Sequence, residues 1–148
     1  MSDRKVGRDD LGFLLAKAMQ RWNDLLAADF ERAGYAEVRP SYGSVLLPLF
    51  EEDGIQMGEL ARRSRLSKQT MTSLVRRVEQ DGLVERRPDP ADARATLIFL
   101  TERAREFEPV AARVLDQRDS LVRARLSPAA VANLRESLRE LGTLEESS

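Results

Sequence analysis

Apolar residues recur at the spacing of an α-helix over most of this chain. One stripe begins at Leu11, a second begins at Phe107, and a third follows Ser127 and Pro128, which make a good N-cap and first helical residue. Each stripe needs a surface that covers it. The positions concerned are Leu11, Leu14, Leu15, Ala18, Trp22, Leu25 and Leu26; Phe107, Val110, Ala111, Val114, Leu115, Leu121 and Val122; and Val131, Leu134, Leu138 and Leu141.

Two shorter helices are expected in the middle of the chain, over residues 57–64 and 67–80. The second has clear signals at both ends, with Ser67 as N-cap and Gly82 as the residue just beyond its end. Two short helices joined by a turn of three or four residues form a helix-turn-helix, whose second helix enters the major groove of DNA. The inward-facing positions are Leu60 and Ala61 in the first helix and Met71, Leu74 and Val78 in the second.

After these helices the pattern changes to two β-prone runs, Leu83–Arg87 and Arg94–Leu100. The segment Pro88–Ala93 between them is rich in Pro and Asp, which favours a turn. The sequence therefore predicts a β-hairpin whose connection is too long for a tight two-residue turn, so that its tip projects.

Three arginines, Arg86, Arg87 and Arg94, are expected at or near this tip, where they would contact the DNA backbone or minor groove. Asp92 stands two residues before Arg94 and is expected to hold its guanidinium by bidentate pairing. A simple surface salt bridge, worth about 0–1 kcal/mol, is the alternative for this pair. Both interpretations hold together if the pair orients the arginine until DNA replaces water.

The second central helix carries polar and basic side chains away from its apolar stripe, of the kinds that contact base edges and phosphates. On an isolated helix such a face would be interpreted as merely solvated. Its position between a first helix and a hairpin favours DNA contact instead. The residues expected in the major groove are Ser67, Lys68, Gln69, Thr70, Thr72 and Ser73, and those expected to reach phosphates are Arg76 and Arg77.

The net charge of −1 argues at first against a nucleic-acid partner, but its distribution reverses that conclusion. Residues 1–61 contain 7 basic and 11 acidic side chains, and residues 95–148 contain 8 and 9. Residues 62–94 contain 9 basic and 5 acidic side chains. Positive charge is concentrated where the helix-turn-helix and hairpin are expected, so binding should depend strongly on salt.

In this order and spacing the motifs resemble those of the MarR family of transcriptional regulators. The resemblance is good over residues 55–101 and looser in the flanking helices. The residues that carry it are Glu59-Leu60-Ala61, the helix from Ser67 to Val78, Gly82-Leu83-Val84, and Asp92-x-Arg94 followed by Leu100-Thr101.

The resemblance implies a mainly α fold with a small β-hairpin wing: a winged helix-turn-helix lobe over residues 41–101, flanked by dimerisation helices over residues 9–33 and 102–146. The long terminal stripes agree, because a winged core alone does not need them. A two-fold homodimer would place two recognition helices about 34–36 Å apart on double-stranded DNA, and a pseudo-palindromic operator is the expected target. The expected function is that of a repressor.

Proteins of this kind often bind small aromatic or phenolic anions between the dimer helices and the DNA-binding lobe. The resemblance therefore implies such an effector, and the side chains expected near its pocket are Trp22, Tyr35, Tyr42 and Phe50. The alternative is that these four aromatic rings serve only as packing material in the core.

The chain contains no Cys and no His, which excludes disulfides, thiol switches and zinc sites built on those ligands. We also find no Gly-rich phosphate loop and no nucleophile elbow, so an enzyme is not expected, and neither a metal nor a cofactor is. No targeting segment or membrane helix is visible, and a cytoplasmic location is expected. A winged-helix module that binds a protein rather than DNA remains the alternative function.

Two prolines stand inside predicted helices. Pro48 falls in the apolar run from Val45 to Phe50, and Pro109 falls in the long helix after Thr101. Each lacks a backbone donor and should kink or locally end its helix. The helix that begins near Met57 also lacks a Ser, Thr or Asp cap, so its start is poorly defined.

Overall fold

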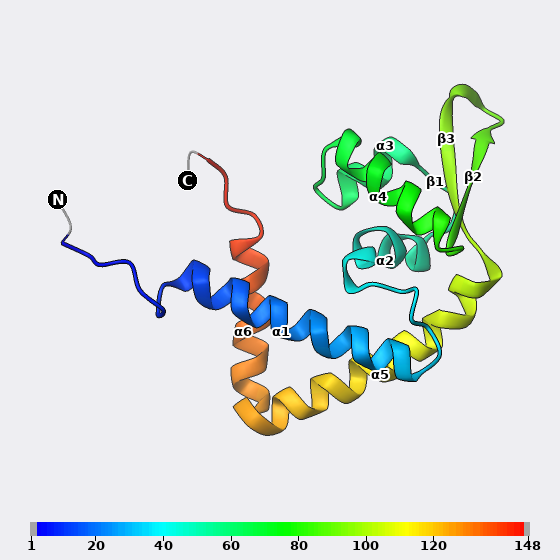
Figure 1. Cartoon of the computed structure of the whole chain (residues 1–148). Coiled ribbons are helices and arrows are strands. Elements are labelled where there is room, and N and C mark those ends of the chain that lie inside the picture. Colours follow the sequence, from blue (N-terminus) through cyan, green and yellow to red (C-terminus); the bar gives the residue numbers. More distant parts are fainter. Residues whose placement is uncertain (1–2, 147–148) are drawn as a thin grey trace. The chain divides into compact units, whose positions relative to one another are not determined.

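Helices make up most of residues 3–146, which are the residues that the computed structural model describes (Figure 1). The expectation of a mainly α fold with a small β wing is confirmed. The chain divides into two compact units, one up to Val110 and one from Ala111. The elements are α1 (Leu11–Arg32), the 3-10 helix η1 (Pro40–Tyr42), α2 (Gly43–Glu51), β1 (Ile55–Gln56), α3 (Met57–Arg63), α4 (Lys68–Gln80), β2 (Val84–Asp89), β3 (Asp92–Leu100), α5 (Glu102–Leu126) and α6 (Pro128–Leu141).

The first unit is built around a core formed by α2, α3, α4 and the sheet (Figure 1). The buried side chains at its centre are hydrophobic, because a buried polar group without a partner would cost free energy. The side chains with at most 1% exposure in this core include Val45, Leu49, Leu60, Met71, Val75, Val78, Leu83 and Ile98. The inward positions expected for α3 and α4 are all among the buried residues, and Val75 joins them.

The sheet has three antiparallel strands in the order β1-β3-β2. Strand β3 pairs with β2 from Val84 opposite Leu100 to Pro88 opposite Thr96, and β1 places Ile55 opposite Ile98. Two residues of β1 are too few for an alternating sequence signal, so this third strand was not expected. It fixes the inner end of the β2–β3 hairpin against the helices.

The tip of the hairpin differs from the sequence prediction. Its strands continue to Asp89 and resume at Asp92, which leaves only two residues between them, so the expected long connection was wrong. The side chain of Asp89 accepts a 2.9 Å hydrogen bond from the Ala91 amide, which stabilises a tight turn. The extra residues instead form a bulge on β3, residues 93–95, where the strand register shifts.

Helix α4 begins and ends where the sequence predicts. The Ser67 hydroxyl accepts a 3.1 Å hydrogen bond from the Thr70 amide, as an N-cap does. At the other end Gly82 adopts φ +76°, and the Leu83 amide donates to the Val78 carbonyl at 3.1 Å. This is a Schellman arrangement, which satisfies the last carbonyls of the helix and turns the chain into β2.

We expect Gly82→Ala to destabilise the fold by about 1–2 kcal/mol, because an L-residue is strained at this positive φ. The space around a Cβ at this position is open, so no steric clash adds to the cost. Gly58 has equally open space but lies inside α3, where Gly58→Ala should stabilise by about 0.5–1 kcal/mol. Denaturant unfolding of both variants measures the difference, and a change of the same sign in both would contradict this role of Gly82.

Neither helix that contains a proline ends there, so that part of the expectation was wrong. Helix α2 continues past Pro48 to Glu51, and α5 passes through Pro109. A proline at position 48 leaves the Ser44 carbonyl without its usual helical donor. The hydroxyl of Ser64 donates to that carbonyl at 2.5 Å, which compensates for the missing bond.

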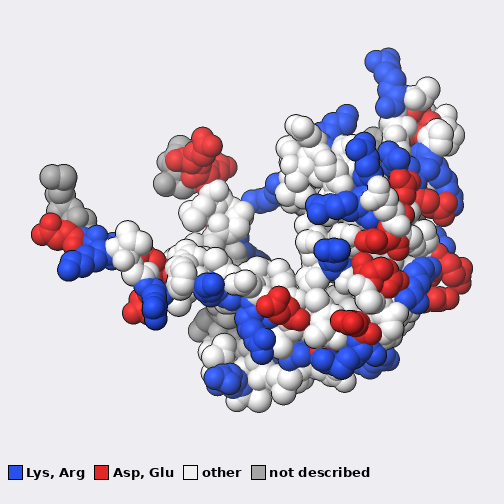
Figure 2. Space-filling model, in the orientation of Figure 1, with Lys and Arg blue, Asp and Glu red and all other residues white. Residues whose placement is uncertain are grey.

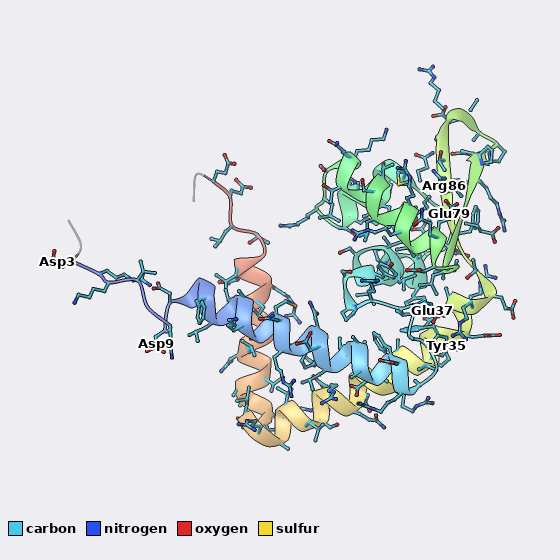
Figure 3. All side chains as sticks on the ribbon, in the orientation of Figure 1. Asp3, Asp9, Tyr35, Glu37, Glu79 and Arg86 are labelled. Atoms are coloured by element: carbon cyan, nitrogen blue, oxygen red, sulfur yellow. The ribbon has the colours of Figure 1, made fainter. Side chains whose placement is uncertain are left out.

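The start of α5 is attached to the turn that follows α1. The Phe107 ring meets the rings of Phe30 and Tyr35 edge-on, with centroids 4.9 and 5.1 Å away. The Arg103 guanidinium lies 3.9 Å from the centre of the Tyr35 ring and donates to Glu37 at 2.7 Å (Tyr35 and Glu37 in Figure 3). The hydrogen bond from Arg103 lowers the pKa of Glu37.

The second unit consists of the later part of α5 and helix α6. Ser127 and Pro128 begin α6 as predicted, and the Ser127 hydroxyl accepts a 3.2 Å hydrogen bond from Ala130. Asp119 on α5 pairs with Arg123 at 3.4 Å and with Arg135 on α6. These contacts hold the two helical segments together at the turn.

Candidate nucleic-acid interface

Helix α4 exposes a polar ridge on the side opposite its buried stripe. At 100° per residue, Gln69, Ser73, Arg76 and Gln80 lie directly opposite Met71 and its buried neighbours. All four ridge residues are exposed. The side chains of Gln69 and Ser73 form no hydrogen bond within residues 3–146, so their donors and acceptors are directed to solvent. Gln80 was not among the sequence candidates, although its spacing from Gln69 by three turns would have revealed it.

Several hydroxyls near the start of α4 already form hydrogen bonds within the helix. The Ser67 hydroxyl donates to the Thr70 hydroxyl at 2.8 Å while it accepts from the Thr70 amide. The Thr72 hydroxyl donates to the Lys68 carbonyl at 2.7 Å. These groups can still accept hydrogen bonds through remaining lone pairs. Their first function is to fix the helix terminus from which Lys68 and Gln69 project.

Two of the wing arginines lie along strand β2 and not at the hairpin tip, so their expected placement was wrong. Arg86 stands opposite Ile98, and Arg87 stands opposite Leu97. The strands are longer than predicted, which moves the tip away from both. Arg87 covers the Phe99 ring at 4.4 Å and contacts Glu85 at 3.1 Å, so its guanidinium is held against the sheet.

The third arginine, Arg94, lies in the bulge beside the tip and is exposed. Within the described part of the chain, Asp92 forms no ion pair with its guanidinium, so the expected bidentate pairing was wrong. Instead the Asp92 carboxylate accepts a 3.0 Å hydrogen bond from the Arg94 backbone amide. The carboxylate thus shapes the backbone of the bulge and leaves the arginine side chain directed to solvent.

A shallow groove of about 380 Å³ lies between the end of α4 and the wing. Three arginines and one glutamate are among its lining residues, so their formal charge is positive. Figure 2 shows basic side chains over the helix-turn-helix and at the tip of the β2–β3 hairpin. The lining residues are Glu79, Arg86, Arg87, Pro88, Ala93, Arg94, Ala95 and Thr96.

Three contacts that position this interface were not found from the sequence. The Gln56 side chain donates to Asp89 at 2.7 Å, which attaches the hairpin tip to β1. This bond and the one from the Ala91 amide lower the pKa of Asp89, the backbone bond having the larger effect. The Thr101 hydroxyl donates to the Gly82 carbonyl at 2.7 Å. Thr101 precedes a helix, so the pattern of an N-cap could have indicated it.

The third contact connects Tyr42 to the end of α4. Its ring is 1% exposed, and its hydroxyl donates to Asp81, the residue that follows the helix. Burial raises the pKa of Tyr42, and the nearby Asp81 carboxylate raises it further. A movement of Tyr42 would therefore also displace Asp81 and the end of α4, where the polar ridge ends.

The four aromatic residues proposed for a ligand pocket are spread over different elements. Trp22 is on α1, Tyr35 is in the turn after it, Tyr42 is in η1, and Phe50 is on α2. Tyr35 and Tyr42 are buried, whereas Trp22 and Phe50 are partly exposed. Among the described residues, the ring contacts join Tyr35 to Phe107 and join none of these four to one another.

The described residues contain no helix that is both long and apolar enough to cross a membrane. They also contain no group of three or more acidic, His or Cys side chains arranged to hold a metal ion.

Comparisons with known proteins match both the sequence and the fold. A model of the MarR family matches residues 40–96. The chain is 43% identical over 61 residues to the HTH-type transcriptional regulator TtmR of Methylorubrum extorquens, a match that covers 41% of this chain and 31% of that relative. The chain thus spans about a third of the length of this curated relative.

Two longer matches are weaker in sequence. The HTH-type transcriptional repressor Rv2887 of Mycobacterium tuberculosis is 27% identical over 121 residues, which cover 73% of this chain and 87% of the relative. A crystal structure of a probable transcriptional regulator from Pseudomonas aeruginosa is 27% identical, with a TM-score of 0.77 over 90% of this chain and 97% of that chain.

Proposed function

Because the chain belongs to the MarR family, we propose that it is a sequence-specific DNA-binding transcriptional regulator. One observation carries this proposal. A capped helix buries its whole apolar face and exposes a polar ridge, and an arginine-bearing hairpin follows directly. This is the arrangement in which a helix occupies the major groove while a wing contacts the backbone or minor groove.

The proposed division of roles follows from which side chains are available. Lys68, Gln69 and Ser73 would contact base edges, together with the remaining acceptors of Ser67, Thr70 and Thr72. Arg76 and Arg77 would reach phosphates. The wing would contribute Arg94 from its bulge and Arg86 and Arg87 from β2, while Asp92 would hold the bulge in shape.

A homodimer is proposed because apolar side chains are exposed in each unit. On α1, Leu11, Leu14 and Met19 are 59%, 48% and 58% exposed, which is unusual for one helix face of a monomer. Helix α6 exposes Leu134 and Leu138. A second copy that covers these faces would complete the dimerisation helices proposed over residues 9–33 and 102–146, outside the winged lobe at 41–101. Because the relative Rv2887 is named a transcriptional repressor, we propose that this protein represses transcription.

Selection of bound fragments from a random duplex library tests this function. We expect enrichment of a pseudo-palindrome whose half-sites are centred about 10 base pairs apart. Enrichment of a single, non-repeated site would contradict the two-fold arrangement. Absence of any duplex binding at low salt would contradict the proposal as a whole and would favour a module that binds protein.

We also propose that a small aromatic or phenolic anion alters DNA affinity. The contact of Tyr42 with Asp81 gives a physical route, because a ligand that shifts Tyr42 would move the end of α4. Trp22 is partly exposed on α1 and Phe50 on α2, so both are accessible for stacking.

Calorimetry with a panel of aromatic acids measures the effector directly. The wild-type protein should bind at least one acid, with a fall in DNA affinity, and Trp22→Ala should weaken that binding about tenfold or more through loss of ring contact. Phe13→Ala is a control, because Phe13 is an exposed aromatic residue on the same helix that is not assigned to the pocket. No binding by the wild-type protein, or equal losses in both variants, would count against the effector site.

A further inference from the structure

An acidic side chain stands among the arginines of the groove between α4 and the wing. Glu79 is on the last turn of α4, and Arg86 is on β2 (Figure 3). The Arg86 Nε lies 3.1 and 3.2 Å from the two carboxylate oxygens, and its Nη2 lies 3.0 Å from Oε1. Two nitrogens of this guanidinium are therefore already bound within the protein.

The pair remains open to solvent and to ligands. The side chain of Glu79 is 30% exposed and that of Arg86 is 42% exposed. Both residues border the groove of about 380 Å³. Arg94 borders the same groove and is exposed, and Arg87 borders it from the neighbouring position of β2. An anion that enters this groove beside Arg86 competes with the Glu79 carboxylate for its guanidinium, in a surface where the basic residues outnumber the acidic one.

We propose that Glu79 is an internal competitor of DNA phosphate for Arg86 and thereby limits the affinity of the protein for DNA. This inference rests on the proposed function. Carboxylate and phosphate oxygens both bind a guanidinium along its edge, so a phosphate cannot take the Nε–Nη2 edge of Arg86 while Glu79 holds it. DNA must either displace Glu79 from this edge or use only the remaining Nη1 donors, with the carboxylate close to its backbone.

The competition acts on phosphates and not on base edges. Its effect should therefore be nearly the same for a selected operator and for a scrambled duplex. Glu79 would keep non-specific binding weak, so that the protein leaves random DNA easily. The polar ridge at Gln69 and Ser73 would then determine where the protein stays bound.

The test is a double-mutant cycle with Glu79→Gln and Arg86→Gln, which keep side-chain size close to the original. Glu79→Gln should bind both duplexes about fivefold more tightly, the scale of an exposed ion pair. The slope of log affinity against log salt should steepen by about 0.9 if one more phosphate is contacted. In the Arg86→Gln background the same substitution should change affinity little, because the contested arginine is gone.

Glu31→Gln is the matched control, since it removes the same charge from an exposed position on α1, outside the groove. It should leave affinity within twofold of wild type. Weaker binding by Glu79→Gln would show that Glu79 orients Arg86 for DNA and would overturn the proposal. A gain that persists in the Arg86→Gln background would overturn it too, because Glu79 would then act only as a distant charge. Failure of the wild-type protein to bind any duplex would instead overturn the proposed function together with this inference.

Discussion

Leu14→Asp is expected to convert the protein from a dimer to a monomer and to weaken binding to a pseudo-palindromic duplex about a hundredfold. Leu14 is 48% exposed and lies on the apolar stripe of α1 that the proposed dimer covers. A carboxylate placed there would have to be buried without a partner in the dimer, but it is solvated in the monomer. The monomer should therefore keep its fold and lose the benefit of a second recognition helix.

Sedimentation measures the mass, which should fall from twice the chain mass to 16.7 kDa, and circular dichroism verifies that the helices remain. Gln20→Asp is the control, since at 100° per residue Gln20 lies opposite the centre of the apolar stripe of α1. This control should remain dimeric and bind as tightly as wild type. A dimeric Leu14→Asp protein with unchanged affinity would exclude this face of α1 from the interface.

Arg94→Ala and Gln69→Ala are expected to impair DNA binding in two different ways. Arg94 projects from a bulge that Asp92 shapes through the backbone, so its loss should weaken binding to most sequences and reduce the salt slope by about 1. Gln69 lies on the exposed ridge of α4 without a hydrogen-bond partner in the described residues. Its loss should cost about 1–3 kcal/mol of discrimination at particular base pairs.

The measurement is affinity for the selected operator and for a set of single-base variants, at two salt concentrations. Gln69→Ala should bind some variants as well as the operator, whereas Arg94→Ala should keep the order of preference and lower every affinity. Equal, sequence-independent losses from both substitutions would refute this division between ridge and wing.

The sequence was most informative where a structure depends on neighbouring residues. Ser67 and Gly82 predicted both ends of α4, because caps act within one helical turn. The apolar stripe of α4 was also predicted, because it depends only on the spacing of residues within one helix. The order of two helices and a β-hairpin then sufficed to identify the fold.

Contacts between distant residues explain what the sequence did not predict. The hairpin tip depends on Gln56 reaching Asp89, 33 positions later, and on a register shift that alternation does not encode. Helix α2 passes through Pro48 because a hydroxyl from Ser64 satisfies a carbonyl 20 positions earlier. The pairing of Arg86 with Glu79 was missed because charge counting locates basic regions and does not identify partners.

The central claim is that α4 and the wing together bind duplex DNA in a sequence-dependent way. Titration of the wild-type protein into the selected duplex and a scrambled duplex, from about 50 to 200 mM salt, tests it most directly. We predict that both affinities fall steeply with salt and that the selected duplex stays about a thousandfold or more tighter throughout. Equal affinity for the two duplexes, or no binding to either at the lowest salt, would contradict the account.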